Sequence, residues 1–336
     1  MKNNDQILLG HGDGGRLTRK LIEDIFAKAF NNPELAPLAD AAILNLNQNK
    51  IAFTTDSYVV NPIFFPGSDI GKLAVFGTAN DLAVMGAKPM FLSSGFILEE
   101  GLEIEILERV VASMKEAAQT VGMKLVTGDT KVVERGSADK IFINTAGIGE
   151  ILDWPSMGSA PEPGDEILLS GCIGDHGISI LAARGELNFS LPVESDCNPV
   201  WPLVNALHRE GVAVKWMRDP TRGGMASAVN ELADGKNFGI RIFEEKIPVR
   251  KAVSSACEIL GLDPLYLANE GKLIAVVKKG GAEKAQKILA SFPIGKDAEV
   301  VGELVANPAG KVIIRTQIGG TRVLSMMAGA PLPRIC

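Results

Sequence analysis

The sequence predicts an α+β protein built from two α/β-type domains, and three observations lead to this prediction. At 336 residues the chain is long enough to bury one large core or two ordinary ones, and two domains are the commoner solution. Short apolar segments of strand length alternate with longer segments of helical periodicity. Residues 153–164, rich in proline and glycine, interrupt this alternation near the middle, which is typical of a linker between domains.

The first half of the chain is expected to form the N-terminal unit. A helix is predicted over 17–30, because its apolar residues mostly fall on one face. A strand over 51–55 follows, and the pair Ser68-Asp69 offers an N-cap for an apolar helix that reaches Met85. The unit is completed by a strand over 91–97, a helix over 102–120, and strands over 123–127 and 140–148.

The second half is expected to begin with a strand over 166–170. The last nine residues contain two prolines, which cannot continue a regular element, so they are predicted to form a mobile tail. The chain is therefore divided into an N-terminal domain over 1–152, a C-terminal domain over 153–327 and a tail over 328–336. Further helices are predicted over 174–184, 199–209, 222–234, 249–260 and 281–291, and further strands over 238–243, 272–277, 298–305 and 311–316.

Composition and charge exclude several classes of protein. The net charge of −6 and the isoelectric point near 5.3 argue against a protein that binds nucleic acid. No apolar run is long enough to span a bilayer, and the N-terminal residues lack the apolar core of a signal peptide. The four cysteines lie far apart and only three histidines are present, so a disulfide framework or a zinc site is not expected. These features predict a cytoplasmic protein with reduced thiols that binds neither nucleic acid nor a membrane.

The segment His11-Gly12-Asp13-Gly14-Gly15 is rich in glycine and precedes the first predicted helix. Glycines expose backbone N–H groups and allow positive φ, so such a segment is suited to wrapping phosphates. It matches neither the P-loop nor the dinucleotide fingerprint, and a plain turn before a helix is an equally good interpretation.

Four aspartates stand at the ends of predicted elements or inside an apolar helix. Asp56 closes a strand, Asp129 follows one, and Asp219 lies between a strand and a helix. Asp81 sits inside an otherwise apolar helix, where an unpaired acid is rarely tolerated. One such acid is more often a cap or a turn residue. Together they place carboxylates at the strand ends where α/β sheets bind ligands, and Mg²⁺ with substrate phosphates would suit this set.

Several further charged residues could meet phosphates or protons. Lys131, Arg222 and Lys272 are possible phosphate partners, although a surface lysine is usually only solvated. Glu270 precedes an apolar strand, and it is interpreted either as a general base or as an ordinary loop acid.

The last residue, Cys336, is the most informative single position. Cys172 and Cys257 are interpreted as core packing, and Cys197 as a loop thiol without a role. A cysteine at the end of a tail cannot be core packing, and an exposed thiol is a liability unless it is used. The sequence does not match a prenylation box, in which the cysteine lies fourth from the end. The chemistry is therefore predicted to converge on the Cys336 thiol.

Eight segments of the chain together resemble one family. They are H-G-x-G-G near the start, F-x-T-D-S-Y, G-T-A-N-D, S-x-G-F-I-L-E-E-G, V-T-G-D-T-K-V-V, D-x-T-R-G-G, A-N-E-G-K-L and the terminal P-R-I-C. They extend over nearly the whole length, and the combination of P-R-I-C with G-D-T-K-V-V is highly specific. On these motifs the chain resembles the HypE family, the carbamoyl dehydratases of nickel–iron hydrogenase maturation.

The resemblance implies a fold and a ligand site. The wider superfamily includes aminoimidazole ribonucleotide synthetase, selenophosphate synthetase and thiamine-monophosphate kinase. It implies a PurM-like N-terminal domain whose sheet builds a homodimer, a PurM C-terminal-like domain, and ATP in the cleft between them. By motif, Asp40, Asp81 and Asp219 look like ligands of Mg²⁺. Contacts to ATP are implied for Asp56, Asn80, Gly128, Asp129 and Thr130, with His11, Gly12, Gly14 and Gly15 closing over the phosphates.

The resemblance also implies the reaction and the partners. A carbamoyltransferase, HypF, would place a carbamoyl group on the Cys336 sulfur, and ATP would phosphorylate the carbonyl oxygen so that phosphate departs. Mg²⁺ and Lys131 would neutralise charge on the transferring phosphoryl group. Either Glu270 or a neutral Lys131 would take protons from the amide nitrogen. The product would be a terminal thiocyanate, whose cyanide passes to iron on the HypC–HypD complex.

Two other interpretations stay open from the residues. Another ATP-dependent enzyme of the superfamily would leave P-R-I-C unexplained, and residues 1–30 contain no cysteine of the kind that selenophosphate synthetase normally carries there. A non-catalytic carrier of a persulfide or metal on Cys336 would leave the clustered acids unexplained.

Overall fold

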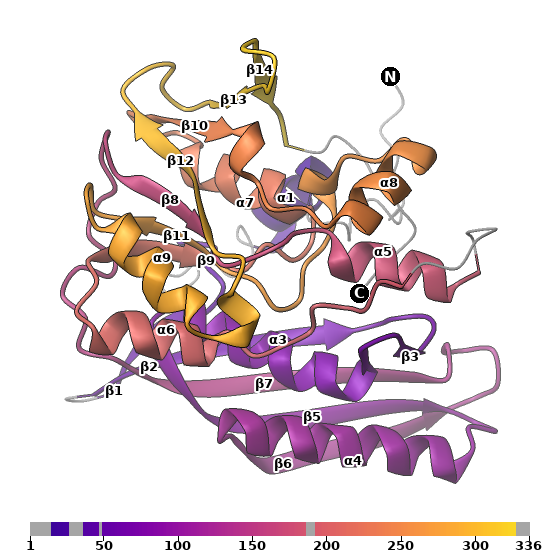
Figure 1. The fold of residues 1–336 in the computed structure, drawn as a ribbon. Coiled ribbons are helices and arrows are strands. Elements are labelled where there is room, and N and C mark those ends of the chain that lie inside the picture. Colours follow the sequence, from indigo (N-terminus) through magenta and orange to yellow (C-terminus); the bar gives the residue numbers. More distant parts are fainter. Residues whose placement is uncertain (1–14, 27–35, 47–48, 186–191, 327–336) are drawn as a thin grey trace.

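The computed structural model describes residues 15–26, 36–46, 49–185 and 192–326. Its helices and strands form two units, each built on its own mixed sheet and joined near the middle of the chain (Figure 1). The α+β class and the two-domain organisation predicted from the sequence are confirmed. The predicted domain boundaries at 152 and 327 stay a prediction, and the tail over 328–336 lies outside the described residues.

The N-terminal sheet has five strands in the order β1-β2-β7-β5-β6, so β1 and β6 form its edges. Neighbouring strands are antiparallel except β5 and β6, which are parallel. Helices α3 and α4 pack against one face of this sheet. The bounds are β1 Ala42–Leu46, β2 Asn49–Tyr58, β5 Ala87–Glu99, β6 Lys124–Val133, β7 Ile141–Ile151, α3 Ile70–Val84 and α4 Ile104–Val121.

Helix α3 is defined by its cap and by its burial. Asp69 Oδ1 accepts the N–H groups of Gly71 and Lys72 at 2.7 and 3.1 Å, which confirms the predicted N-cap. Nearly every residue of the helix is buried, because it packs against the N-terminal sheet on one side and against the C-terminal unit on the other (Figure 1). A helix that is apolar on all sides is expected in such a place.

The C-terminal sheet has seven strands in the order β14-β13-β10-β12-β8-β11-β9. Only β10 and β13 are parallel neighbours. None of the described helices of either unit is both long and apolar enough to cross a membrane. The bounds are β8 Glu166–Leu169, β9 Val214–Arg218, β10 Gly239–Phe243, β11 Ile274–Val277, β12 Glu299–Val305, β13 Val312–Arg315, β14 Thr321–Leu324, α5 Asp175–Ala183, α6 Trp201–Arg209, α7 Gly224–Ala233, α8 Lys251–Leu260 and α9 Ala282–Ala290; short 3₁₀ turns cover Glu244–Lys246, Pro264–Tyr266 and Pro293–Gly295.

The segment between the two units follows the predicted linker and forms turns rather than a helix or a strand. It is anchored on the C-terminal side, because the Trp154 indole is 7 % exposed and donates from Nε1 to the Val212 carbonyl at 2.9 Å. The linker therefore contributes a side chain to the core of the C-terminal unit, in addition to connecting the two units.

Three features of the N-terminal unit differ from the prediction. The helix expected over 17–30 is α-helical only over Arg16–Leu21 (α1) and continues as a π-helical turn, η2, over Ile22–Phe26; residues 27–30 lie outside the described part. The edge strand β1 and the two-residue pair β3 (Phe64–Phe65) and β4 (Ser68–Asp69) were not predicted.

Candidate functional site

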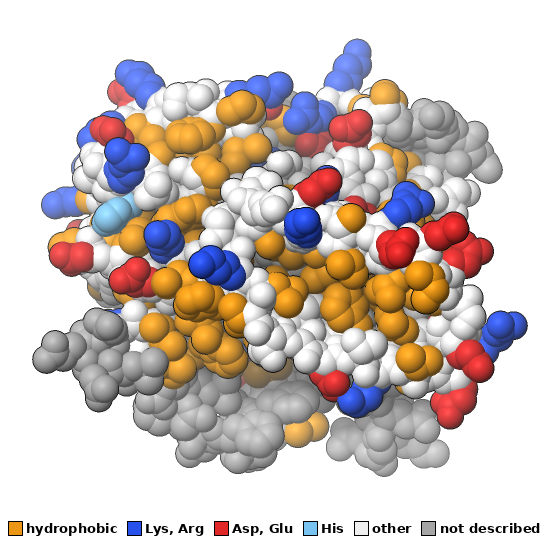
Figure 2. All heavy atoms as spheres, turned by 90° about the horizontal axis from the view of Figure 1, so that it is seen from below, with side chains coloured by type: hydrophobic (Ala, Val, Ile, Leu, Met, Phe, Trp, Pro, Cys, Tyr) orange, Lys and Arg blue, Asp and Glu red, His pale blue; other side chains and the backbone are white. Residues whose placement is uncertain are grey.

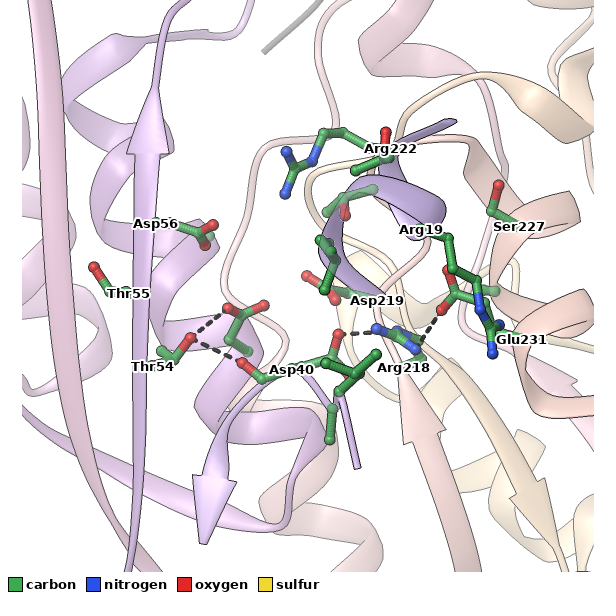
Figure 3. Close-up of a pocket in the computed structure, with 18 of the residues that line it drawn as sticks. Arg19, Asp40, Thr54, Thr55, Asp56, Arg218, Asp219, Arg222, Ser227 and Glu231 are labelled. Atoms are coloured by element: carbon green, nitrogen blue, oxygen red, sulfur yellow. Dashed lines mark hydrogen bonds and ion pairs between the residues drawn. The ribbon is translucent and has the colours of Figure 1, made fainter. Parts of the chain in front are cut away.

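A cavity of about 920 Å³ lies between the two units and is lined by residues from both. The N-terminal unit contributes α1, residues 36–40, the end of β2 and one face of α3. The C-terminal unit contributes the turn from β9 into α7, together with Glu270. In Figure 3 Thr54 and Asp56 come from β2 on one side, and Arg218, Asp219 and Arg222 come from the other. The site is thus assembled only when the two units pack together.

Three acids gather at the floor of this cavity. Asp40 precedes β1, Asp81 lies on the last turn of α3, and Asp219 directly follows β9. One carboxylate oxygen of each lies within 4.8 Å of the others. Oxygen ligands at this mutual spacing suit Mg²⁺, which takes few protein carboxylates and completes its shell with water and phosphates. The three residues that the motifs implied as metal ligands are therefore brought together from distant parts of the chain.

The charges in the cavity are poorly balanced by the protein itself. Burial raises the pKa of Asp81 well above its ordinary value, and the charges of Asp56, Asp219 and Asp40 raise it further. For Asp219, burial and then the neighbouring Asp40 raise the pKa to about 8. Carboxyl groups this close cannot all ionise without a compensating cation. A divalent ion at this position would supply that compensation.

Polar contacts hold two of the three acids, Asp40 and Asp81, in place. The Thr54 hydroxyl lies 2.8 Å from both the Asp40 carbonyl and Asp81 Oδ2, so its single proton is donated to one of them at a time. Arg218 donates from Nε to Asp40 Oδ1 at 2.9 Å and pairs through Nη1 with Glu231 of α7 (Figure 3). Arg218 contacts one oxygen of Asp40, so a strand of the C-terminal unit orients an acid of the N-terminal unit.

Asp56 also lines the cavity, where the motifs implied a contact to ATP. The Tyr58 hydroxyl donates to Asp56 Oδ2 at 3.2 Å and lies 3.3 Å from the Thr78 hydroxyl. A side chain at Gly77 would collide with this same Tyr58 hydroxyl, which explains the glycine of G-T-A-N-D. Burial raises the pKa of Asp56 above its ordinary value, while Arg222 across the cavity lowers it.

Asn80 occupies a different place from the one expected of a nucleotide contact. Its side chain is 1 % exposed and does not line the cavity. The amide nitrogen donates to the carbonyls of Asn198 and Glu270 at 3.1 and 3.3 Å, and the amide oxygen accepts from Val200 N at 2.8 Å. Asn80 therefore ties α3 to the C-terminal unit.

The segment 128–131 lies far from the cavity in the single chain. Gly128, Asp129, Thr130 and Lys131 all belong to the edge strand β6, at the opposite end of the sheet from β1 and β2. Lys131 Nζ lies 2.8 Å from Asp129 Oδ2, and the two side chains are 70 and 69 % exposed. The structure of one chain does not bring Lys131 next to Glu270.

The remaining expected residues lie in the cavity, away from it, or outside the described part of the chain. Glu270 lines the cavity, is 4 % exposed, and has a pKa raised well above its ordinary value by burial and by Asp219. Gly15 caps α1 and does not line the cavity. Lys272 is not a phosphate partner in the cavity, because it is buried in an ion pair with Asp196. His11, Gly12, Gly14 and Cys336 lie outside the described residues.

The three cysteines of the described part are free and buried. Cys172 and Cys257 fit the predicted core packing, at 8 and 2 % exposed. Cys197 lies in a loop, as predicted, and the structure adds that it is buried there, at 4 % exposed, and packs in the core of the N-terminal unit.

Sequence reasoning missed residues of the cavity that interact with the acids. Arg218 ends a buried strand immediately before Asp219, and a cation inside an apolar strand is a signal that could have identified it. Arg19 of α1 forms an ion pair with Asp234 at the end of α7, with 3.0 Å between Nη2 and Oδ2. This contact joins the two units and cannot be predicted from the local sequence.

Comparison with known proteins agrees with this architecture. Residues 38–151 match the N-terminal domain and residues 162–315 the C-terminal domain of AIR synthase related proteins. The carbamoyl dehydratases HypE of Rhodobacter capsulatus and of Escherichia coli strain K12 are each 47 % identical to this chain, over 99 % of this chain in both cases and over 99 and 100 % of their own lengths.

Solved structures show the same relationship. A HypE chain from a HypE–HypF complex superposes with a TM-score of 0.86 at 49 % identity, covering 91 % of this chain and 99 % of that one. A HypE structure in complex with ATP gives a TM-score of 0.82 at 50 % identity, covering 98 and 100 %. The thiamine monophosphate kinase of Aquifex aeolicus shares the fold alone, with a TM-score of 0.66 at 20 % identity. The chain therefore belongs to the HypE carbamoyl dehydratases of hydrogenase maturation, within the AIR synthase related proteins.

Proposed function

We propose that this protein uses ATP to dehydrate an S-carbamoyl group on its own Cys336 to a thiocyanate, which supplies cyanide to the iron of a nickel–iron hydrogenase. The observation that carries the proposal is the acidic cavity between the units, where Asp40, Asp81 and Asp219 converge beside Glu270. A site of this charge suits Mg²⁺ with a polyphosphate, and a relative's structure contains ATP. The non-catalytic carrier would need no such cavity.

The reaction replaces a poor leaving group by a good one. The carbonyl oxygen of the carboxamide attacks the γ-phosphorus of ATP and ADP departs, so that the oxygen becomes a phosphate ester. The amide nitrogen then loses its two protons, the carbon–oxygen bond breaks, and inorganic phosphate leaves a carbon–nitrogen triple bond on sulfur. Mg²⁺ held by the three aspartates would neutralise charge on the phosphoryl group as it transfers.

The chain's own residues would bind ATP and move the protons. Asp56 would face the nucleotide, and Arg222, across the cavity from it, would meet phosphate oxygens. Glu270, whose pKa is raised well above its ordinary value by burial, is suited to accept a proton from the amide nitrogen. Lys131 remains the alternative proton acceptor, or a cation that stabilises the transferring phosphate, with Asp129 and Thr130 beside it.

Lys131 would serve the reaction in the cavity of a second copy. Lys131 of β6 lies directly beside Ile97 of β5 in the strand register, so the two side chains project from the same face of the sheet. That face also carries Phe53 and Phe91, which are 40 and 37 % exposed, and Ile97 is 42 % exposed. Figure 2, seen from the β5–β6 side of the molecule, shows apolar side chains gathered on this part of the surface. We therefore propose a homodimer that forms through the N-terminal sheet.

The proposed partners and location follow from the chemistry. A carbamoyltransferase must load Cys336, and a relative has been solved in complex with HypF. An iron-bearing acceptor such as the HypC–HypD complex must receive the cyanide. Free thiols at all three described cysteines suit the reducing cytoplasm.

Intact mass spectrometry tests the proposed function directly. The protein is incubated with HypF, carbamoyl phosphate, Mg²⁺ and ATP, and the expected mass first rises by one carbamoyl group and then falls by one water. Cys336→Ala is expected to abolish both changes, while the triple variant with Cys172, Cys197 and Cys257 changed to Ser should retain them. A Cys336→Ala protein that still becomes cyanated would disprove the proposal.

A further inference from the structure

Glu270 is fixed by its backbone rather than by its carboxylate. Its N–H donates to Asp196 Oδ1 at 3.0 Å. Its carbonyl accepts from Asn80 Nδ2 at 3.3 Å and from the Asn198 N–H at 3.4 Å. Among the described residues, the carboxylate itself has no hydrogen bond or ion pair, although it is almost wholly buried and lines the cavity. Asp196 and Asn80 are thus two buried side-chain anchors of the Glu270 backbone, and they leave the Glu270 carboxylate able to contact a molecule bound in the cavity.

The first anchor, Asp196, is itself held by Lys272. The Lys272 ammonium lies 3.0 Å from Asp196 Oδ2, and the two side chains are 8 and 2 % exposed. This contact is an ion pair without the alignment of a hydrogen bond. Burying such a pair costs desolvation energy that its attraction often does not recover, so stability alone explains it poorly. What the pair does achieve is to hold the Asp196 carboxylate in place beside the Glu270 N–H.

The backbone around this anchor has no room to move. A side chain at Gly271 would collide with the Asp196 carbonyl and would lie 2.9 Å from Asn198 N. The chain after Glu270 is therefore in close contact with the loop that carries Asp196. Movement of that loop would move Glu270 with it.

We propose that Asp196, held by Lys272, and Asn80 are positioning residues that aim the carboxylate of Glu270 at the amide nitrogen of the substrate. The inference rests on the proposed function, because it gives Glu270 the role of proton acceptor. Asp196 and Asn80 approach Glu270 from different units, so the carboxylate takes its position only when the units are packed. A misplacement of about 1 Å in such a group can cost on the order of a hundredfold in rate.

Two charge-neutral double variants test this role. Asp196→Leu with Lys272→Met removes the ion pair and the acceptor for the Glu270 N–H, whereas Asp196→Asn with Lys272→Met removes the pair but keeps an oxygen acceptor. The rate of water loss from the carbamoylated protein is followed by intact mass at saturating Mg²⁺ and ATP. The leucine variant should be slower by roughly 30- to 100-fold, and the asparagine variant by less than about threefold. Both should bind ATP as tightly as the wild type.

The same pairs in a Glu270→Gln background separate positioning from a merely structural effect. If Asp196 acts through Glu270, the leucine and asparagine variants should dehydrate equally slowly there. A rate difference that persists without Glu270, or equal rates in its presence, would overturn the proposal. Should the leucine variant not fold, Asn80→Ala removes the other side-chain anchor, leaving only the Asn198 N–H on the Glu270 carbonyl, and is expected to slow dehydration about tenfold. An unchanged rate overturns the role of Asn80. Normal dehydration by Glu270→Gln alone would instead refute Glu270 as the proton acceptor.

Discussion

At the scale of single residues, Asp219 shows how the fold loads the cavity with charge that it does not neutralise. Burial and Asp40 raise its pKa to about 8, from an ordinary value near 4. The folded state therefore binds more protons than the unfolded state between these values. The free energy of unfolding falls as pH rises through this window, with no loss below it and the full loss above it.

We expect the melting temperature of the metal-free protein to fall between about pH 4 and pH 8 because Asp219 must ionise in place. Asp219→Asn should flatten this dependence, and Mg²⁺ should raise the melting temperature more near pH 8 than near pH 5. Scanning fluorimetry across the pH series measures all three. Asp153→Asn, an exposed acid outside the cavity, is the matched control and should keep the wild-type profile. A wild-type profile that is flat over this range would contradict the expectation.

The acids of the site could be predicted from the sequence better than the cations that pair with them. Asp81 could be singled out because an unpaired acid is rarely tolerated inside an apolar helix. Arg218 and Lys272 are both cations in buried strands or loops, yet one orients Asp40 in the cavity and the other pairs with Asp196 away from it. That difference depends on which loops meet across the two units, which local sequence does not contain.

At the scale of elements, most helices and strands were predictable because their apolar periodicity coincides with burial. Helix α4 shows this well, since its buried residues Val110, Met114, Ala117 and Val121 repeat at helical spacing. The edge strand β14, Thr321–Leu324, was missed because three of its four residues are exposed and only pairing with β13 makes it a strand. Tertiary pairing, rather than propensity, decides such segments.

The contact between α3 and β2 gives a prediction at this scale. Gly77→Ala should lower the free energy of unfolding by about 1–3 kcal/mol and weaken ATP binding, because the added methyl displaces Tyr58 from Asp56. Adding Tyr58→Phe should recover part of the stability by removing the clashing hydroxyl. Gly95→Ala, whose new methyl would have no neighbour nearer than 3.8 Å, is the matched control. Chemical denaturation and calorimetry measure the two effects, and an unchanged Gly77→Ala protein would disprove the steric argument.

At the scale of the whole molecule, the distance of Lys131 from the cavity makes the proposed dimer part of the chemistry. The cavity of one chain contains Glu270, whereas Lys131 lies on the edge strand β6. If each cavity combines Glu270 of one chain with the lysine of a second copy, two different inactive proteins should restore each other's activity.

Mixing Lys131→Ala with Glu270→Gln tests this combination. Random reassortment makes about half of the dimers mixed, and each mixed dimer carries one intact site, so about a quarter of wild-type dehydration should return. Each variant alone should stay inactive, and mixing either with itself provides the control. No recovery after exchange, with mixed dimers confirmed by native mass spectrometry, would show that both residues act within one chain. A Lys131→Ala protein that is active before mixing would show that Lys131 has no role.

The burial of the three inner cysteines has a consequence for selectivity. Burial raises the pKa of Cys172 and Cys257 to about 11 and that of Cys197 still higher, so all three are poor nucleophiles at neutral pH. The fold thus shields these three thiols from reagents in solution. An electrophile that reacts indiscriminately with cysteine in a peptide would find three of the four sulfurs masked in the native protein, and unmasking them would require denaturation. A loading enzyme need not discriminate among the four sulfurs, because the fold has already removed three of them from competition.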